Sequence, residues 1–184
     1  MTAADSASIN AIVTFWNEAG TKGQWFNKDA AFDREFHDRF HALHMEAAAR
    51  QHDSWMATPE GALALLILLD QFPRNCFRGT GHMYATDPLA RHFARAAQAA
   101  GHMDRIAGDL RLFFCLPFAH SEDLADQDIS VTLNGKLGGK YIEHAEGHRD
   151  IIKRFGRFPH RNAMLGRATT DAEARFLSEG GFAG

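Results

Sequence analysis

Apolar residues along the chain recur at the three- and four-residue spacing of an α-helix. Ile9, Ile12 and Trp16 show this spacing within residues 8–19, and a stripe of phenylalanines repeats it within residues 29–51. Because this period places apolar side chains on one face of a helix, both stretches are predicted to form amphipathic helices. No stretch of the sequence shows the alternation of apolar and polar residues that is typical of a strand.

Start and stop signals divide the rest of the chain into further helices. Thr58 before a proline is typical of a helix start, and Gly101 is typical of a helix end. Ser121 is predicted to cap a helix, and Thr170 with Glu173 forms a capping box. The predicted helices cover residues 8–19, 29–51, 59–71, 87–100, 108–118, 121–133 and 140–154, with a short last helix that begins at the capping box.

These elements predict an all-α fold. We expect an irregular helical bundle of about seven to nine helices with tetratricopeptide-like packing of helical hairpins. A chain of 184 residues suits a single domain, residues 1–184. Within it, two related helix-turn-helix segments are expected at about 59–101 and 140–181.

Two segments carry nearly the same residues. Residues 70–75 read Asp-Gln-Phe-Pro-Arg-Asn, and residues 156–162 read Gly-Arg-Phe-Pro-His-Arg-Asn; we call them the first and the second Phe-Pro segment. Proline stops a preceding helix and asparagine favours turns, but a turn requires neither Phe nor Arg. The sequence therefore predicts that Pro73 ends its helix, that both turns present guanidinium groups, and that Asn75 and Asn162 bond main-chain groups.

Composition and charge narrow the function classes. The chain is 45% hydrophobic and 23% charged, which is typical of a globular protein, and its net charge of −3 argues against nucleic-acid binding. The two cysteines carry no metal or redox spacing, and the N-terminus lacks a signal peptide pattern. The longest apolar run, residues 62–69, is too short to span a membrane. We therefore expect a cytoplasmic protein without membrane contact.

Arginines gather around both Phe-Pro segments. A guanidinium binds a carboxylate or phosphate through two parallel hydrogen bonds, and several of these arginines precede a helix start. The sequence predicts a pocket for a small anion lined by Arg74, Arg78, Arg157, Arg161 and Arg167, with Asp70 beside them. The alternative is that these arginines bond local carbonyls or pair with internal acids, for which Asp70, Asp87, Glu122 and Asp126 are available.

Histidines and one glutamate supply candidate acid–base groups. His120, Glu122, His148 and His160 can transfer protons once their surroundings adjust their pKa values. The alternative is that Glu122 only favours a helix start and that His148 belongs to a polar cluster. Eleven histidines produce metal-like spacings by chance, and no His-Glu-x-x-His motif is present, so no metal and no cofactor is predicted.

Longer phrases resemble a known family. Leu-Leu-Asp-Gln-Phe-Pro-Arg-Asn at residues 68–75, Thr-Asp-Pro-Leu-Ala at 86–90, His-Ser-Glu at 120–122, and Arg-Phe-Gly-Arg-Phe-Pro-His-Arg-Asn at 154–162 with Leu-Gly-Arg at 165–167 are similar to the bacterial domain of unknown function 924. The resemblance extends over nearly the whole chain. It implies an all-helical fold similar to tetratricopeptide-like domains, and it implies no activity.

Two interpretations of function remain. In the first, the protein binds a small anionic molecule, a carboxylate or phosphate, and catalyses cofactor-free acid–base chemistry such as hydrolysis. In the second, it is a non-enzymatic helical binding or scaffold protein for a peptide or partner protein, and the cluster of arginines, histidines and acids is structural. The sequence leaves the choice between an enzyme and a binding protein open, and it leaves open whether the chain forms a homodimer.

Overall fold

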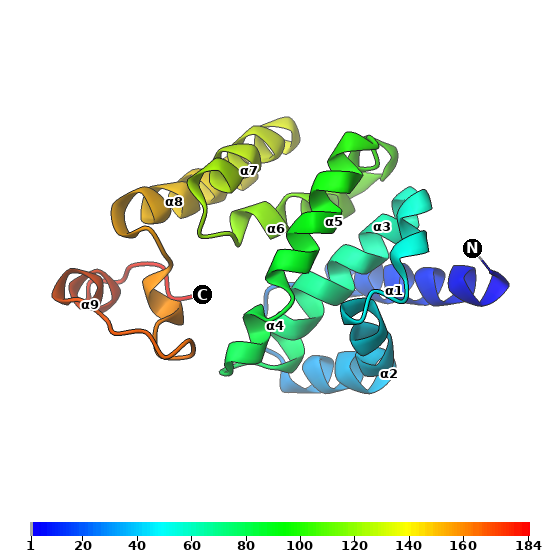
Figure 1. Ribbon diagram of the computed structural model, residues 1–184, viewed down its shortest axis with the longest axis horizontal. Helices are drawn as coiled ribbons and strands as arrows, with labels where there is room; N and C mark the ends of the chain where they lie inside the picture. Colours follow the sequence, from blue (N-terminus) through cyan, green and yellow to red (C-terminus); the bar gives the residue numbers. More distant parts are fainter. Residues whose placement is uncertain (1) are drawn as a thin grey trace. The chain divides into compact units, whose positions relative to one another are not determined.

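The computed structural model describes residues 2–184, and this part of the chain contains nine α-helices and no strand (Figure 1). The all-α prediction is confirmed. The α-helices are α1 (Ala3–Thr21), α2 (Ala30–Ala48), α3 (Pro59–Leu66), α4 (Phe72–Cys76), α5 (Asp87–Ala99), α6 (Leu116–Ala119), α7 (Leu124–Leu137), α8 (Lys140–Phe155) and α9 (Asp171–Ser178). Short 3-10 and π-helical turns, labelled η1 to η6, join several of them.

The helices fall into two compact units. The first contains the chain up to Arg78 together with His82–Pro117, and the second contains Gly79–Gly81 and Phe118–Gly184. The first Phe-Pro segment therefore lies in the first unit, and the second Phe-Pro segment lies in the second unit. None of the helices within residues 2–184 is long and apolar enough to cross a membrane.

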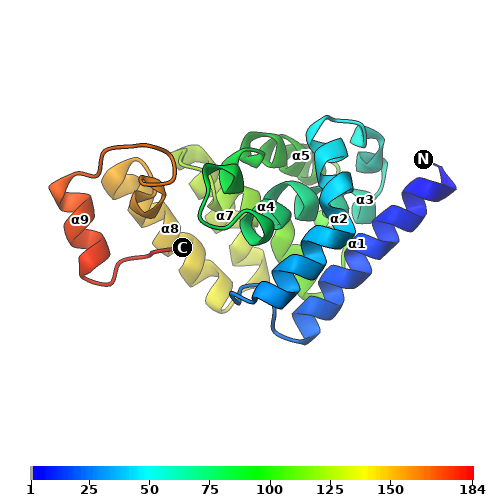
Figure 2. The same ribbon diagram turned by 90° about the horizontal axis from the view of Figure 1, so that it is seen from below.

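Aromatic rings form the core of the first unit. Trp16 and Phe36 are fully buried, with ring centroids 5.1 Å apart, and Phe15 stacks on Phe32. Helices α1 and α2 run side by side (Figure 2), and the contacts of the Phe15 ring with Phe32 and Phe36 show that their apolar stripes face each other. The amphipathic spacing that predicted these two helices also identified the residues they bury.

The helix that carries the first Phe-Pro segment continues through its proline. A π-helical turn, η2 (Ile67–Gln71), joins α3 to α4, and Pro73 lies inside α4. The prediction that Pro73 ends the helix is wrong. Proline lacks an N–H, so nearby carbonyls lose their helical donor. The π-turn instead exposes the carbonyls of Leu68 and Leu69, which accept hydrogen bonds from His44 Nδ1 at 2.9 Å and Thr86 Oγ1 at 2.6 Å.

In the second unit, glycines with positive φ follow two helices, and α7 extends beyond the end that the sequence predicted at residue 133. Gly138, at φ 74°, follows α7, and Gly156, at φ 68°, ends α8 in the left-handed conformation that glycine adopts at little cost. Helices α7 and α8 lie side by side (Figure 1). The capping box of Thr170 and Glu173 begins α9 as predicted.

Other boundaries differ from the prediction. Asp123, not Ser121, caps α7, and Ser121 donates instead to Asp126 at 2.7 Å. Helix α5 begins at Asp87 as predicted, but neither neighbouring side chain caps it: the hydroxyl of Thr86 donates to the Leu69 carbonyl, and Asp87 binds Arg74. The predicted helix 108–118 is a 3-10 turn, η5 (Gly108–Phe114), followed by the short α6.

Candidate functional site

In the first unit, Arg74 is held between two buried carboxylates. Its guanidinium makes two parallel hydrogen bonds to Asp87, at 2.8 and 2.9 Å, and lies 3.1 Å from the carboxylate of Asp70. The π-turn places Asp70 here, and the start of α5 supplies Asp87. The chain itself therefore provides the paired oxygens that a carboxylate ligand would offer.

Arg78 and Asn75 share a third carboxylate, that of Asp33 in α2. Arg78 Nε donates to Asp33 at 2.6 Å, and Asn75 Nδ2 donates to the same carboxylate at 2.9 Å. The three side chains tie the end of α4 to the first turn of α2. Asn75 thus bonds a side chain rather than the main chain, which differs from our prediction.

The second Phe-Pro segment repeats this chemistry with another acid. Arg157 binds Glu173 through Nε at 2.5 Å and through a second nitrogen at 2.8 Å, and Asn162 Nδ2 lies 3.3 Å from the same carboxylate. The hydrogen bond from Arg157, followed by that from the Thr170 amide, lowers the pKa of Glu173 to about 2. Asn162 also donates to the hydroxyl of Thr169, so its predicted bond to the main chain is wrong as well.

Glu122 connects the start of the second unit to the second Phe-Pro segment. Its carboxylate accepts two hydrogen bonds from Arg167, at 2.7 and 3.0 Å, and one from the Phe158 amide at 2.8 Å. Burial would raise the pKa of Glu122, but these hydrogen bonds and the charges of Arg167 and Arg161 outweigh it, and the pKa is lowered. Glu122 is therefore an ionised hydrogen-bond acceptor at neutral pH.

The side chains of Arg161, His148 and His160 surround the buried ring of Phe158. The Arg161 guanidinium lies 4.5 Å from the ring centroid, and the two imidazole centroids lie 5.5 and 5.6 Å from it. Arg161, which is 6% exposed, also donates to the main-chain carbonyl of His120 at 3.0 Å. We call Arg161, His120, His148 and His160 the histidine–arginine cluster.

Burial and positive charge keep two of these imidazoles neutral. Burial, followed by the charges of His120 and Arg161, lowers the pKa of His148 to about 3. Burial and then the charge of Arg161 lower the pKa of His160 to about 4, although Glu122 acts in the opposite direction. In both rings, Nδ1 is buried and has no hydrogen-bond partner among the residues described.

The structure thus divides the predicted site residues between the two units. Arg74, Arg78 and Asp70 belong to the first unit. The second unit brings together the others, which are His120, Glu122, His148, Arg157, His160, Arg161 and Arg167. Carboxylates of the chain bind Arg74, Arg78, Arg157 and Arg167, and two of these acids, Asp33 and Glu173, were not among the partners that the sequence suggested.

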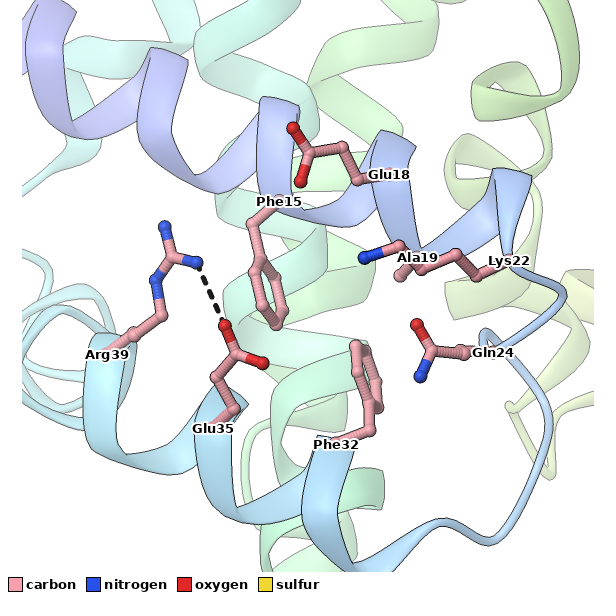
Figure 3. Close-up of a pocket in the computed structure, with 8 residues that line it drawn as sticks. All are labelled: Phe15, Glu18, Ala19, Lys22, Gln24, Phe32, Glu35 and Arg39. Carbon is pink, nitrogen blue, oxygen red and sulfur yellow. Dashed lines mark hydrogen bonds and ion pairs between the residues drawn. The ribbon is translucent and has the colours of Figure 1, made fainter.

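A depression in the first unit was not anticipated from the sequence. It has a volume of about 40 Å³ and lies between α1 and α2, where the stacked rings of Phe15 and Phe32 form its floor (Figure 3). Arg39 on its rim pairs with Glu35 at 3.2 Å, and its guanidinium lies over Phe15. The only sign of this depression in the sequence is the pair of charged residues, Glu35 and Arg39, that lie beside the apolar stripe of α2. The space suits water rather than a metabolite.

Metal binding receives no support from side-chain placement. Within residues 2–184, no group of three or more His, Cys, Asp or Glu side chains is arranged to hold a metal ion. His144 and His148, which have the spacing of a metal pair, lack a third such ligand in this part of the chain.

The fold and these buried ion pairs define an all-helical protein with carboxylate–arginine links between helices. The chain belongs to a family of bacterial proteins of unknown function, DUF924, whose model matches residues 12–181. It is similar to a solved structure of a protein of unknown function from Agrobacterium tumefaciens, with 58% identity and a TM-score of 0.93. That likeness covers 95% of this chain and 99% of the other. No curated protein matches the chain.

Proposed function

We propose that the second unit binds a small anion, a carboxylate or a phosphate, at the histidine–arginine cluster. The observation that carries this proposal is the pair of buried Nδ1 atoms on His148 and His160, which lack hydrogen-bond partners among the described residues beside the Arg161 guanidinium. A buried polar atom without a partner is costly, and a bound oxygen would relieve that cost if the ring nitrogens donate. Arg157, Arg167 and Glu122 then support the cluster by fixing the second Phe-Pro segment.

Electrostatics also favour an anion at this place. Burial, and after it the positive charge near the cluster, lowers the pKa values of both imidazoles. A negative ligand would stabilise the imidazolium form and raise both pKa values. A base with a pKa of about 3 or 4 is weak at neutral pH, and binding of the anion would raise the pKa of the imidazoles toward neutral pH. Cofactor-free acid–base chemistry such as hydrolysis therefore requires that the ligand itself is bound.

The second candidate is a helical binding or scaffold protein without catalysis. It is favoured by the carboxylates that occupy Arg74, Arg78, Arg157 and Arg167, because such links hold helices together. In that case the arginines are structural, and the protein surface rather than the cluster would bind a peptide or partner protein.

Nuclear magnetic resonance of the histidine Cε1–Hε1 groups distinguishes the two. The wild-type protein is titrated at neutral pH with sodium phosphate and, separately, with sodium chloride at equal ionic strength. We expect saturable shifts of His148 and His160 in phosphate alone. His44, a buried histidine of the first unit whose pKa is also lowered by burial, is the internal control and should not respond.

Three variants complete this experiment. H148Q and H160Q assign the signals, and R161Q should remove the phosphate response while circular dichroism shows the same helical content. Equal shifts in phosphate and in chloride would contradict the anion site and favour the scaffold function.

A further inference from the structure

The segment after α9 turns back onto the histidine–arginine cluster. Both views show the chain after α9 running toward the segment around residue 160 (Figures 1 and 2). Gly180 makes this turn with φ 87°. At Gly181, an added Cβ would lie 2.5 Å from the Phe176 carbonyl oxygen and 2.6 Å from its ring, so only glycine fits there. The turn therefore depends on two glycines.

The turn places the ring of Phe182 against the histidine–arginine cluster. Its centroid lies 4.6 Å from that of His148 and 5.1 Å from that of His160, and both contacts are edge-on, with interplanar angles of 75° and 82°. The Phe158 ring centroid is 6.4 Å away. The rings of Phe158, His148 and His160 thus form a binding site for the ring of Phe182, in the geometry that aromatic pairs prefer. We call this three-ring site the seat.

Few contacts hold the ring of Phe182 in place. The residue remains 43% exposed, although its ring lies against three others. The last backbone hydrogen bond along this segment, among the described residues, is that of the Gly181 amide to Phe176 at 2.9 Å. A ring held by a few edge contacts on a short segment can be displaced by a ring that binds there more firmly.

The ring of Phe182 and the guanidinium of Arg161 both lie against Phe158. The Phe158 ring contacts Phe182 on one side and carries the Arg161 guanidinium at 4.5 Å. One small molecule can therefore reach both places if it joins an acid group to a ring through a short chain. A simple anion would use only the arginine and the imidazoles, and it would leave Phe182 seated.

We propose that the ligand of the cluster is an aryl-alkyl carboxylate whose ring takes the place of Phe182, so that Phe182 is an internal competitor for the site. This proposal rests on the anion site described above, because the acid group requires Arg161. It adds the class of ligand and the side chain that must leave before that ligand binds.

Binding of four probes to four proteins tests this proposal. The probes are inorganic phosphate, acetate, 3-phenylpropionate and 3-cyclohexylpropionate, and the proteins are the wild type, F182A, F182L and F26A. Phe26, which is 65% exposed and lies in the first unit, is the matched control. Affinities come from the shifts of His148 and His160, and circular dichroism checks that each variant folds. F182L, which keeps apolar bulk without a ring, is the second variant.

We expect F182A to bind 3-phenylpropionate about tenfold more tightly than the wild type, because a competing ring with several aromatic contacts is gone. F182L should give a smaller gain, whereas F26A should equal the wild type. Phosphate and acetate should bind all four proteins alike.

The outcomes separate the two proposals. If phosphate binds but 3-phenylpropionate gains nothing from F182A, the aromatic ligand is wrong and the anion site stands. If 3-cyclohexylpropionate gains as much as 3-phenylpropionate, the seat accepts any apolar group and the aromatic class is also wrong. If none of the four probes shifts His148 or His160, both proposals fail together.

Discussion

Phe72-Pro73 lies inside a helical stretch, whereas Phe158-Pro159 follows a helix that has already ended. In the first segment, Phe72 itself has helical angles, φ −51° and ψ −50°, which a following proline normally disfavours. In the second segment, Phe158 is extended, with φ −87° and ψ 109°. Nearly identical residues therefore occur on two different backbones.

The difference originates before the proline. Gly156 stops α8 in the second segment. The first segment has no such glycine, and the run Leu63–Leu69 is fully buried on all sides. Continuing that helix keeps this apolar surface packed, while His44 and Thr86 satisfy carbonyls near the proline. Tertiary packing thus outweighs the local preference of proline.

The side-chain chemistry is nevertheless shared. Asn75 and Asn162 each donate to a carboxylate that also binds an arginine, Arg78 in one case and Arg157 in the other. The repeated residues therefore specify a link between helices rather than a turn. The comparison predicts that variants in the two segments lose stability for different reasons and by different amounts.

The largest expected difference concerns Arg74 and Arg157. R74M leaves two buried carboxylates, Asp70 and Asp87, without their guanidinium, and we expect it to lower the free energy of unfolding by about 3–5 kcal/mol. R157M should cost less, because Glu173 keeps its hydrogen bond from the Thr170 amide. Urea denaturation followed by circular dichroism measures both, and equal losses would show that the two links are equivalent.

Lowering the pH should reduce the free energy of unfolding through His148 in α8 and His160 in the second Phe-Pro segment. Their pKa values in the folded protein, about 3 and 4, lie below the ordinary 6.5, so the unfolded chain binds more protons as the pH falls. Their stabilising contribution is complete above pH 6.5 and is lost progressively below it. We expect each to remove about 2 kcal/mol between pH 7 and pH 5.

Denaturation at a series of pH values measures this loss. H160Q should reduce the slope of stability against pH, while H92Q, at an exposed histidine of α5, should leave the slope unchanged. A wild-type stability that stays constant between pH 7 and pH 5 would mean that these imidazoles are not held neutral.

Much of the fold was predictable from the sequence because its signals are local. The apolar stripes of α1 and α2, the cap at Thr58 and the capping box at Thr170 each depend on residues a few positions apart. The π-turn was not predictable, because it depends on His44, which is 24 residues away from the carbonyl it bonds. A proline in a local window gives no sign of such a donor.

The candidate site was predictable only as a set of residue types. The sequence indicated the arginines and the three histidines, but pairing is a property of the tertiary structure. Asp33 lies 45 residues from Arg78, and Glu173 has a capping role that conceals its ion pair. The ring of Phe182 gave no signal, because its contact with His148 exists only in the folded chain.

Removing the hydroxyl of Thr86 tests whether it compensates for the backbone N–H that Pro73 lacks. T86V removes the donor to the Leu69 carbonyl while keeping the side-chain shape, and we expect a loss of about 1–3 kcal/mol. In a P73A background, a backbone N–H becomes available nearby, so the same change should cost about 1 kcal/mol less. A double-mutant cycle of the free energies of unfolding gives this coupling, and strict additivity would show that the proline and the threonine act independently.

The smallest expected effect isolates the glycine that distinguishes the two segments. Gly156 has φ 68°, and an added Cβ would meet no atom within 4 Å, so G156A changes only the backbone preference. We expect a loss of about 1 kcal/mol, because a left-handed conformation disfavours residues with a Cβ. Gly147, inside α8, also has no atom within 4 Å of an added Cβ, so G147A is the matched control and should stabilise by about 0.5–1 kcal/mol. Opposite signs in urea denaturation would establish that Gly156 acts through its conformation. If G156A were neutral, the end of α8 would be set by the extended residue before Pro159, and the glycine would not explain why the two segments differ.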